Sequence, residues 1–330
     1  MSTNALRDLN GPAVPELEKK NENSSKGNFI KVTLENNSEI LGKFQNLSSS
    51  SVTLQNGSGV ESNGEIGNVE VEYVETENLV DLLLVDETVN VTLLARLDSK
   101  DWVSVCEALN NVRQLSFYHM EKLTDMLGDL VSKIVKSLKN PRSAVCKTAI
   151  MTAADIFKVY NDRIIEFLDP MLVQLLLKSS QDKRFVCDAS ETALIAMTTW
   201  ISPSLLLSKL LPYLKNKNPR IRAKASMCFS RSVSQLGDEG IKRYGIDKLI
   251  QIAASQLSDQ LPESREAART LVMELQTFYE RSQSSSSEDL SLDSESTSWE
   301  AFCQSELSPL SAQAILRVTS TAKEGSVLGC

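Results

Sequence analysis

The feature that most constrains this 330-residue chain is a repeated helical pattern between residues 78 and 281. Five segments can be placed in register, and each opens what reads as the second helix of a helical pair. An anchor residue recurs at one position, at spacings of 40, 41, 35 and 43 residues: Val105, Val145, Val186, Ile221 and Ser264. Such a period indicates that each pair buries its apolar face only against neighbouring pairs.

Hydrophobic spacing within the repeats supports helices directly. In the second unit, Val145, Ala149, Ile150, Ala153 and Ile156 follow the spacing of one helical face. The chain is 42% hydrophobic but only 5% aromatic, which suits a core of aliphatic helices better than aromatic-rich strands. The sequence therefore predicts an all-α solenoid of the HEAT/ARM type with about five repeats.

Charge and composition divide the chain into four parts. Residues 88–281 carry a net charge of +6, whereas the rest carries −14. We expect residues 1–77 to be a largely disordered N-terminal region, although FIKVTL and SVTLQN alternate like strands of a hairpin. Residues 78–281 are the predicted repeat domain. Residues 282–300 read as a serine-rich acidic linker, and residues 301–330 as a C-terminal tail with one short helix from Ser308 or Pro309.

Targeting signals are not recognisable in the sequence. No apolar run follows Met1, and no stretch of about 20 apolar residues occurs. We therefore expect a cytoplasmic protein that does not enter membranes. Its six cysteines are expected to be reduced thiols in that compartment.

The residues with catalytic or metal-binding chemistry do not form a recognisable site. Cys106, Cys146 and Cys187 share one repeat position, which is occupied by Arg222 and Arg265 in later units, so they read as repeat copies. His119 is the single histidine and is expected in a connection between helices. Phosphate-binding, nucleophile-elbow and zinc motifs are lacking. The prediction is a protein that is not an enzyme and needs no cofactor or metal.

A row of basic residues is predicted along the turns that join first to second helices. Three residues before each anchor stand Trp102, Arg142, Lys183, Asn218 and Leu261, and repeat-equivalent residues align along one edge of a solenoid. Trp102 sits at the very start of its helix, where we expect an exposed aromatic that acts as a binding hot spot. Trp200, at the end of a helix, is expected to pack ordinarily. Arg222 and Arg265 are expected to support packing between repeats.

These turns also carry a family resemblance. The stretches LDSKDWVSVCEAL (97–109), NPRSAV (140–145), QDKRFV (181–186) and KNPRIRAKA (217–225) resemble the intra-repeat turns of TOG domains, most closely those of the CLASP and crescerin type. The resemblance implies that one narrow edge binds the tubulin heterodimer, with an aromatic residue in the first turn and basic or amide residues in later ones. By matching position it implies a tubulin-binding role for these residues: Trp102, Asn140, Arg142, Ser143, Lys183, Arg184, Asn218 and Arg220, and weakly Glu263. TOG domains usually have six repeats, and a sixth would need the 301–322 segment.

The predicted function is therefore that of a microtubule-associated protein that binds tubulin and regulates microtubule dynamics, with other proteins as further partners of the flanks. The alternative is a HEAT/ARM scaffold or adaptor for another acidic protein. Nucleic-acid binding is disfavoured, because +6 over the repeat region is modest and the ridge has one aromatic where stacking surfaces use several.

Overall fold

The computed structural model describes residues 73–82, 89–285 and 298–327. Within these ranges every regular element is an α-helix or a short 3-10 helix. The elements are η1 (Thr76–Asn78), α1 (Val89–Leu97), α2 (Trp102–Tyr118), α3 (Met120–Thr124), α4 (Leu127–Leu138), α5 (Ser143–Tyr160), η2 (Asn161–Phe167), α6 (Leu168–Lys178), α7 (Arg184–Trp200), α8 (Pro203–Leu210), η3 (Leu211–Lys215), α9 (Pro219–Ser234), α10 (Gly237–Tyr244), α11 (Ile246–Leu257), α12 (Pro262–Ser285), α13 (Trp299–Glu306) and α14 (Pro309–Val327).

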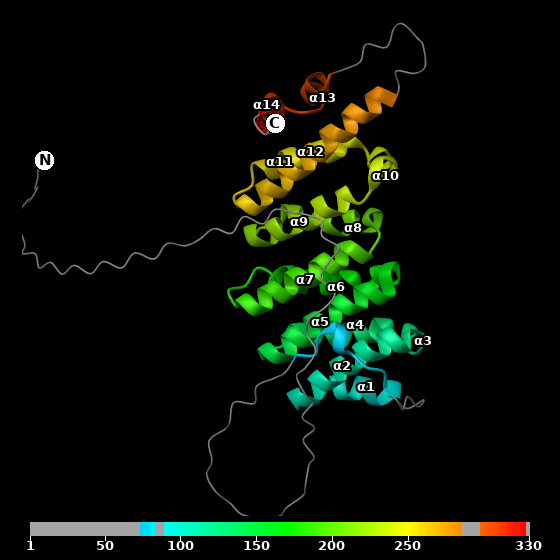
Figure 1. Ribbon diagram of the computed structural model, residues 1–330. Helices are drawn as coiled ribbons and strands as arrows, with labels where there is room; N and C mark the ends of the chain where they lie inside the picture. The colour runs from blue at the N-terminus through cyan, green and yellow to red at the C-terminus, as the bar shows by residue number, and fades with distance from the viewer. Residues whose placement is uncertain (1–72, 83–88, 286–297, 328–330) are drawn as a thin grey trace, which may run out of the picture. The chain divides into compact units, whose positions relative to one another are not determined.

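The helices form hairpins that stack in chain order (Figure 1). The second helices α2, α5, α7, α9 and α12 pack in sequence against one another, and each also packs against the first helix of its own hairpin. One continuous hydrophobic core runs through the stack from Leu93 to Ile315. The predicted all-α HEAT-type solenoid is confirmed.

The repeat register is visible in burial. All five anchor residues are buried, with Ser264 fully enclosed like Val145. Ser264 is tolerated at an otherwise apolar position because its hydroxyl is 3.0 Å from Ser226 Oγ and donates to Gln256 Oε1 at 3.2 Å. A buried hydroxyl with such partners avoids the cost of an unpaired polar group.

In the last four of the five repeats, the residue after the anchor has a common structural task, which cysteine performs at Cys146 and Cys187 and arginine at Arg222 and Arg265. The Cys146 thiol donates to Leu138 O, and the Cys187 thiol donates to Ser179 O at 3.0 Å. Arg222 instead donates to Asn216 O, and Arg265 to Asp259 O at 2.8 Å. Each side chain thus satisfies a carbonyl at the end of the preceding helix, where the helix itself offers no donor.

A sixth helical hairpin follows the five that the sequence showed. α13 and α14 pack against each other and against α11 and α12. The sequence placed this stretch in a tail with one short helix, but Trp299, Cys303, Ala312 and Ile315 are buried in the shared core. These apolar side chains can be buried only because α11 and α12 leave one face of the stack uncovered. The local hydrophobic pattern of the segment does not reveal that face.

Residues 73–82, here called the N-terminal strap, pack on α2 and α5. Thr76 Oγ1 donates to Asp155 Oδ1 at 2.9 Å, and Tyr118 OH donates to Leu79 O at 2.9 Å. Leu79 is buried. The sequence placed residues 73–77 in the disordered flank, but these contacts make them part of the folded unit. The strand alternation expected in residues 28–76 lies almost wholly outside the described residues.

A buried ion pair holds the strap. Arg113 of α2 is fully buried, and its Nε lies 2.6 Å from Asp155 Oδ2 on α5. The same guanidinium donates to Val74 O at 2.7 Å and to Thr76 Oγ1 at 3.3 Å. His119, in the connection predicted for it, lies 2.8 Å from Asp81 of the strap. The strap therefore supplies acceptors that a buried guanidinium would otherwise lack.

Candidate functional site: the edge formed by the intra-repeat turns

The eight residues singled out by the sequence all lie in the turns between first and second helices or at the starts of the second helices. We call this set the turn edge: Trp102, Asn140, Arg142, Ser143, Lys183, Arg184, Asn218 and Arg220. In Figure 1 these turns share one side of the stack, opposite the side on which α3 and α10 are drawn.

Each turn is shaped by a short polar side chain that accepts a backbone hydrogen bond. Asp101 accepts from the N–H groups of Val103 and Ser104 and so caps α2. Asn140 Oδ1 accepts from Arg142 N at 2.9 Å, and Asn218 Oδ1 accepts from Arg220 N at 3.0 Å. Asn140 and Asn218 therefore have a local role in the turn, which presents the arginine two residues later.

Contacts between successive turns join the edge into one surface. The Arg142 guanidinium lies over the Trp102 ring, 4.7 Å from its centroid. In the next step, Lys183 Nζ donates to Ser143 Oγ at 3.0 Å. These contacts place the first, second and third turns side by side.

The third and fourth turns are joined in the same way. Arg220 Nη1 donates to Ser180 O and to Asp182 Oδ1, both at 3.0 Å. Beside Arg220, a hollow of about 340 Å³ extends from Ser180 and Asp182 to Leu261 and Glu263 of the fifth turn. The turns that the sequence placed in register are thus also neighbours in space.

Trp102 is less exposed than the sequence suggested. It is half-buried and packs against the edge of the hydrophobic core, while Arg142 covers its ring. The difference arises because the first residue of α2 lies against the next repeat, which a single repeat does not show. Trp102 and Arg142 therefore form one composite surface, an aromatic ring under a cation.

The exposed charges of the edge are partly balanced by carboxylates. Arg184 is 94% exposed and 3.8 Å from Asp188, while Arg220 pairs with Asp182. Asp98 in the first turn accepts hydrogen bonds from Lys133 and Lys136, which hold the pKa of Asp98 below its usual value. Because the pairs of Arg184 and Arg220 are exposed, these two arginines remain available to an acidic partner together with Lys183 and Arg142.

Sequence reasoning missed one aromatic residue beside the edge. Phe185 follows Lys183 and Arg184 and is 44% exposed, bordering a hollow of about 350 Å³ with Met151 and Ala189. A signal was present, because Phe185 occupies the repeat position of the polar Ser104 and Arg220 rather than an anchor position. Trp200, which was expected to pack ordinarily, is 43% exposed at the far end of α7.

Arg222 has the packing role predicted for it. Its Nε lies 2.6 Å from Asp259 Oδ2, which joins the fourth turn to the fifth. Burial raises the pKa of Asp259, but hydrogen bonds from Arg222 and from the N–H groups of Leu261 and Gln260 outweigh this, so the pKa lies below its ordinary value. Arg265 donates hydrogen bonds to Asp259 O and Gln260 O within its own turn.

The Asp259 pair predicts a pH effect on stability. A carboxylate whose pKa is lowered by folding stabilises the protein above its unfolded pKa of about 3.9 and loses that contribution as the pH falls through the folded pKa. We expect Asp259→Asn to lower the free energy of unfolding at pH 7 by about 1.5–3 kcal/mol. Urea titrations at pH 7, 5 and 3 measure this difference, which should shrink at the lowest pH.

The control for this prediction is Asp188→Asn, which breaks an exposed pair on α7. That change should shift stability by no more than about 0.5 kcal/mol at any of these pH values. If the Asp259→Asn difference were the same at pH 3 as at pH 7, the ionised pair would not be its cause.

Comparison with known proteins identifies the family of the chain. The sequence model of the CLASP N-terminal family matches residues 115–298, more than half of the chain and all of the repeats from the end of α2 to the start of the sixth hairpin. The chain belongs to the CLASP N-terminal family. This membership agrees with the resemblance carried by the turns.

Two curated relatives have TOG-array or crescerin names. TOG array regulator of axonemal microtubules protein 1 of mouse is 29% identical over 118 residues, which are 36% of this chain and 7% of that protein. Crescerin-like protein che-12 of Caenorhabditis elegans is 23% identical over 176 residues, 52% of this chain and 14% of that protein. This CLASP N-terminal chain therefore spans only a small part of the length of these relatives.

A solved structure extends the similarity to the fold. The structure reported for crescerin, which uses a TOG domain array to regulate microtubules in the primary cilium, has a TM-score of 0.50 at 16% identity. The match covers 70% of this chain and 88% of the solved chain. The CLASP N-terminal chain thus has a TOG-like fold.

Two further properties concern only the described ranges. No helix among them is both long and apolar enough to cross a membrane. No group of three or more histidine, cysteine, aspartate or glutamate side chains among them is arranged to hold a metal ion.

Burial raises the pKa of the Cys228 thiol to about 12, so Cys228 is a poor nucleophile.

Proposed function

We propose that this chain binds tubulin through the turn edge and regulates microtubule assembly or stability in the cytoplasmic microtubule cytoskeleton. The observation that carries the proposal is the series of contacts from Trp102 through Arg142, Lys183 and Arg220, which makes the turns one surface. The family membership and the relatives named as microtubule regulators support it. The role is one of binding rather than catalysis.

The chemistry of the edge suits a large acidic protein partner. An aromatic ring under a guanidinium gives a rigid contact, and the exposed cations Lys183 and Arg184 steer association with a negatively charged surface. Exposed charge contacts contribute only about 0.2–1 kcal/mol each and are screened by salt. Binding should therefore weaken steadily as the salt concentration rises.

The test is gel filtration of the full chain with unpolymerised tubulin. We expect wild type to co-elute with tubulin and the double reversal Lys183→Glu/Arg220→Glu to weaken binding at least about tenfold, equivalent to about 1.4 kcal/mol. The matched control is Lys242→Glu/Arg243→Glu, which changes the net charge equally at exposed positions of α10.

The outcomes separate the edge from bulk charge. Equal weakening by both double variants would mean that net charge, not the turn edge, governs binding. Absence of co-elution for wild type, together with recovery of a different acidic partner from an extract depleted of tubulin, would favour the scaffold function instead.

A further inference from the structure

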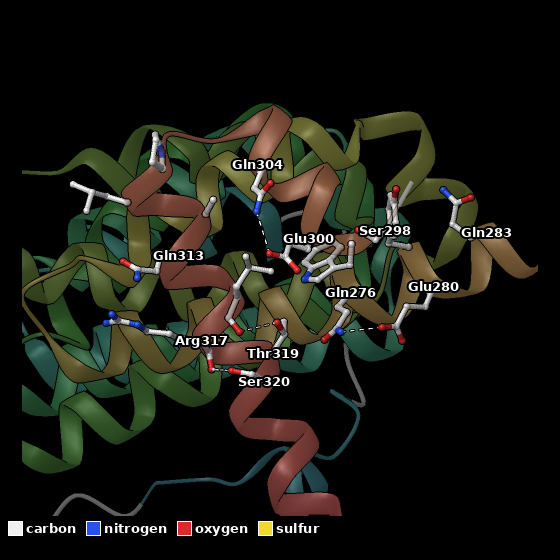
Figure 2. Close-up of a pocket in the computed structure, with 16 residues that line it drawn as sticks. Gln276, Glu280, Gln283, Ser298, Glu300, Gln304, Gln313, Arg317, Thr319 and Ser320 are labelled. Atoms are coloured by element: carbon white, nitrogen blue, oxygen red, sulfur yellow. Dashed lines mark hydrogen bonds between the residues drawn. The ribbon is translucent and has the colours of Figure 1, made fainter. Parts of the chain in front are cut away.

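A large hollow lies in the sixth hairpin, away from the turn edge. It has a volume of about 1230 Å³ and is lined by the second half of α12, by residues 298–304 around α13, and by α14. Figure 2 shows the labelled polar residues that line it, which come from these three helices. Pockets for single small ligands measure about 300–1000 Å³, so this one is large enough for a longer molecule.

One wall of the pocket contains a buried donor without an acceptor. Trp299 is 9% exposed, lines the pocket, and its Nε1–H has no hydrogen-bond partner. Tyr279 and Phe302 hold the indole in place, with ring centroids 5.6 and 5.7 Å from that of Trp299. A buried N–H left unpaired is costly, and an acceptor brought by a ligand would relieve that cost once the side chains that cover Nε1 move aside.

The remaining polar lining is rich in amides. Gln276, Gln283, Gln304 and Gln313 all border the pocket and come from all three helices. A glutamine amide offers both a donor and an acceptor, which is the pattern that peptide groups present. Gln276 and Gln304 each direct one N–H to a glutamate of the same helix, Glu280 at 2.9 Å and Glu300 at 3.1 Å, and Figure 2 shows both pairs.

The charge of the pocket is unevenly placed. Glu280 and Glu300 are on the side where α12 and α13 meet, whereas Arg317 extends from α14 on the opposite side in Figure 2. Burial of apolar lining from Tyr279, Leu310 and Leu316 would add affinity for a ligand with aliphatic parts. A positively charged group of a ligand would therefore be attracted to the Glu300 carboxylate.

We propose that the pocket between α12, α13 and α14 binds an extended peptide of a partner protein, with a backbone carbonyl accepting from Trp299 Nε1 and a lysine or arginine beside Glu300. The amides of the pocket orient the peptide backbone, and the carboxylates select its charge. The site is separate from the turn edge and does not depend on tubulin binding.

The experiment uses the full chain and three pools of fluorescent capped hexapeptides. The pools are random at five positions and carry lysine, glutamate or alanine at the third, and fluorescence anisotropy measures their binding. We expect the lysine pool to bind wild type at least about tenfold more tightly than the glutamate pool. Trp299→Phe, which keeps the ring but removes the N–H, should weaken the lysine pool about tenfold.

A second variant tests the charge selection. Glu300→Lys should reverse the preference between the lysine and glutamate pools, while Trp200→Phe, outside the pocket, should change nothing. The proposal would be overturned if no pool bound wild type. It would also be overturned if Trp299→Phe and Glu300→Lys both bound the pools as wild type does. Because tubulin co-elution of Trp299→Phe should equal that of wild type, this site and the turn edge can fail independently.

Discussion

Replacement of Arg113 by alanine is expected to lower the free energy of unfolding by about 3–5 kcal/mol. Arg113 is fully buried, and its removal leaves the Asp155 carboxylate buried without its charge partner. The change also removes the donor to Val74 O and Thr76 Oγ1, so the strap loses its attachment. Urea denaturation of the full chain measures the loss, and hydrogen exchange of the amides of residues 75–79 should accelerate in parallel.

Two comparisons make this result specific. The double variant Arg113→Met/Asp155→Leu removes both charges and should recover most of the loss, because two apolar side chains of similar size carry no desolvation cost. Arg269→Ala, which breaks an exposed pair with Glu266 on α12, should cost no more than about 0.5 kcal/mol. A double variant as unstable as Arg113→Ala would show that the unpaired charge is not the cause.

The second large effect concerns tubulin. We expect Trp102→Ala to weaken binding about 30-fold or more, equivalent to about 2 kcal/mol, as truncation of an aromatic hot spot does. The change removes the ring on which the Arg142 guanidinium rests, so Arg142 also loses its fixed position in the second turn. Titration of unpolymerised tubulin with each variant measures the effect.

The matched control for Trp102 is Trp200. Trp200 also lies partly exposed near a cation, with Lys158 Nζ 5.9 Å from its ring centroid, but it ends α7 rather than beginning a second helix. Trp200→Ala should leave tubulin affinity unchanged. Since Trp102 also touches the core, Trp102→Phe serves as a second variant that keeps the packing, and it should retain most of the binding. Equal loss from Trp102→Ala and Trp200→Ala would argue against the turn edge.

Much of the fold could be predicted from the sequence, because a solenoid repeats the same helical hairpin along the chain. The anchors Val145 and Val186 are buried where the register put them, and the turns before Ser143 and Arg184 fall where the second helices were expected to begin. The same register brought the turn-edge residues together, because equivalent positions of stacked repeats become neighbours. Their role in binding tubulin stays a prediction.

What the register could not provide was contact between parts that do not repeat. Arg113 and Asp155 lie 42 residues apart and read as isolated charges on two helices, and their third partner, Thr76, comes from outside the repeats. The sequence predicted an exposed Trp102 side chain, because no pattern within its own repeat indicates that Arg142 of the next repeat lies over the ring. The sequence left a sixth repeat open and could only point to the 301–322 segment, because burial of the sixth hairpin depends on the open face of α11 and α12.

The sequence by itself determined the helical repeat, its register and the side of the stack on which its turns lie, because these follow from periodic burial along the chain. Only the tertiary structure decided which charges are buried together, how far Trp102 is covered, and that α12, α13 and α14 enclose a pocket around Trp299. These features depend on contacts between segments that are far apart in the chain. A local sequence pattern does not determine the free energy of such contacts.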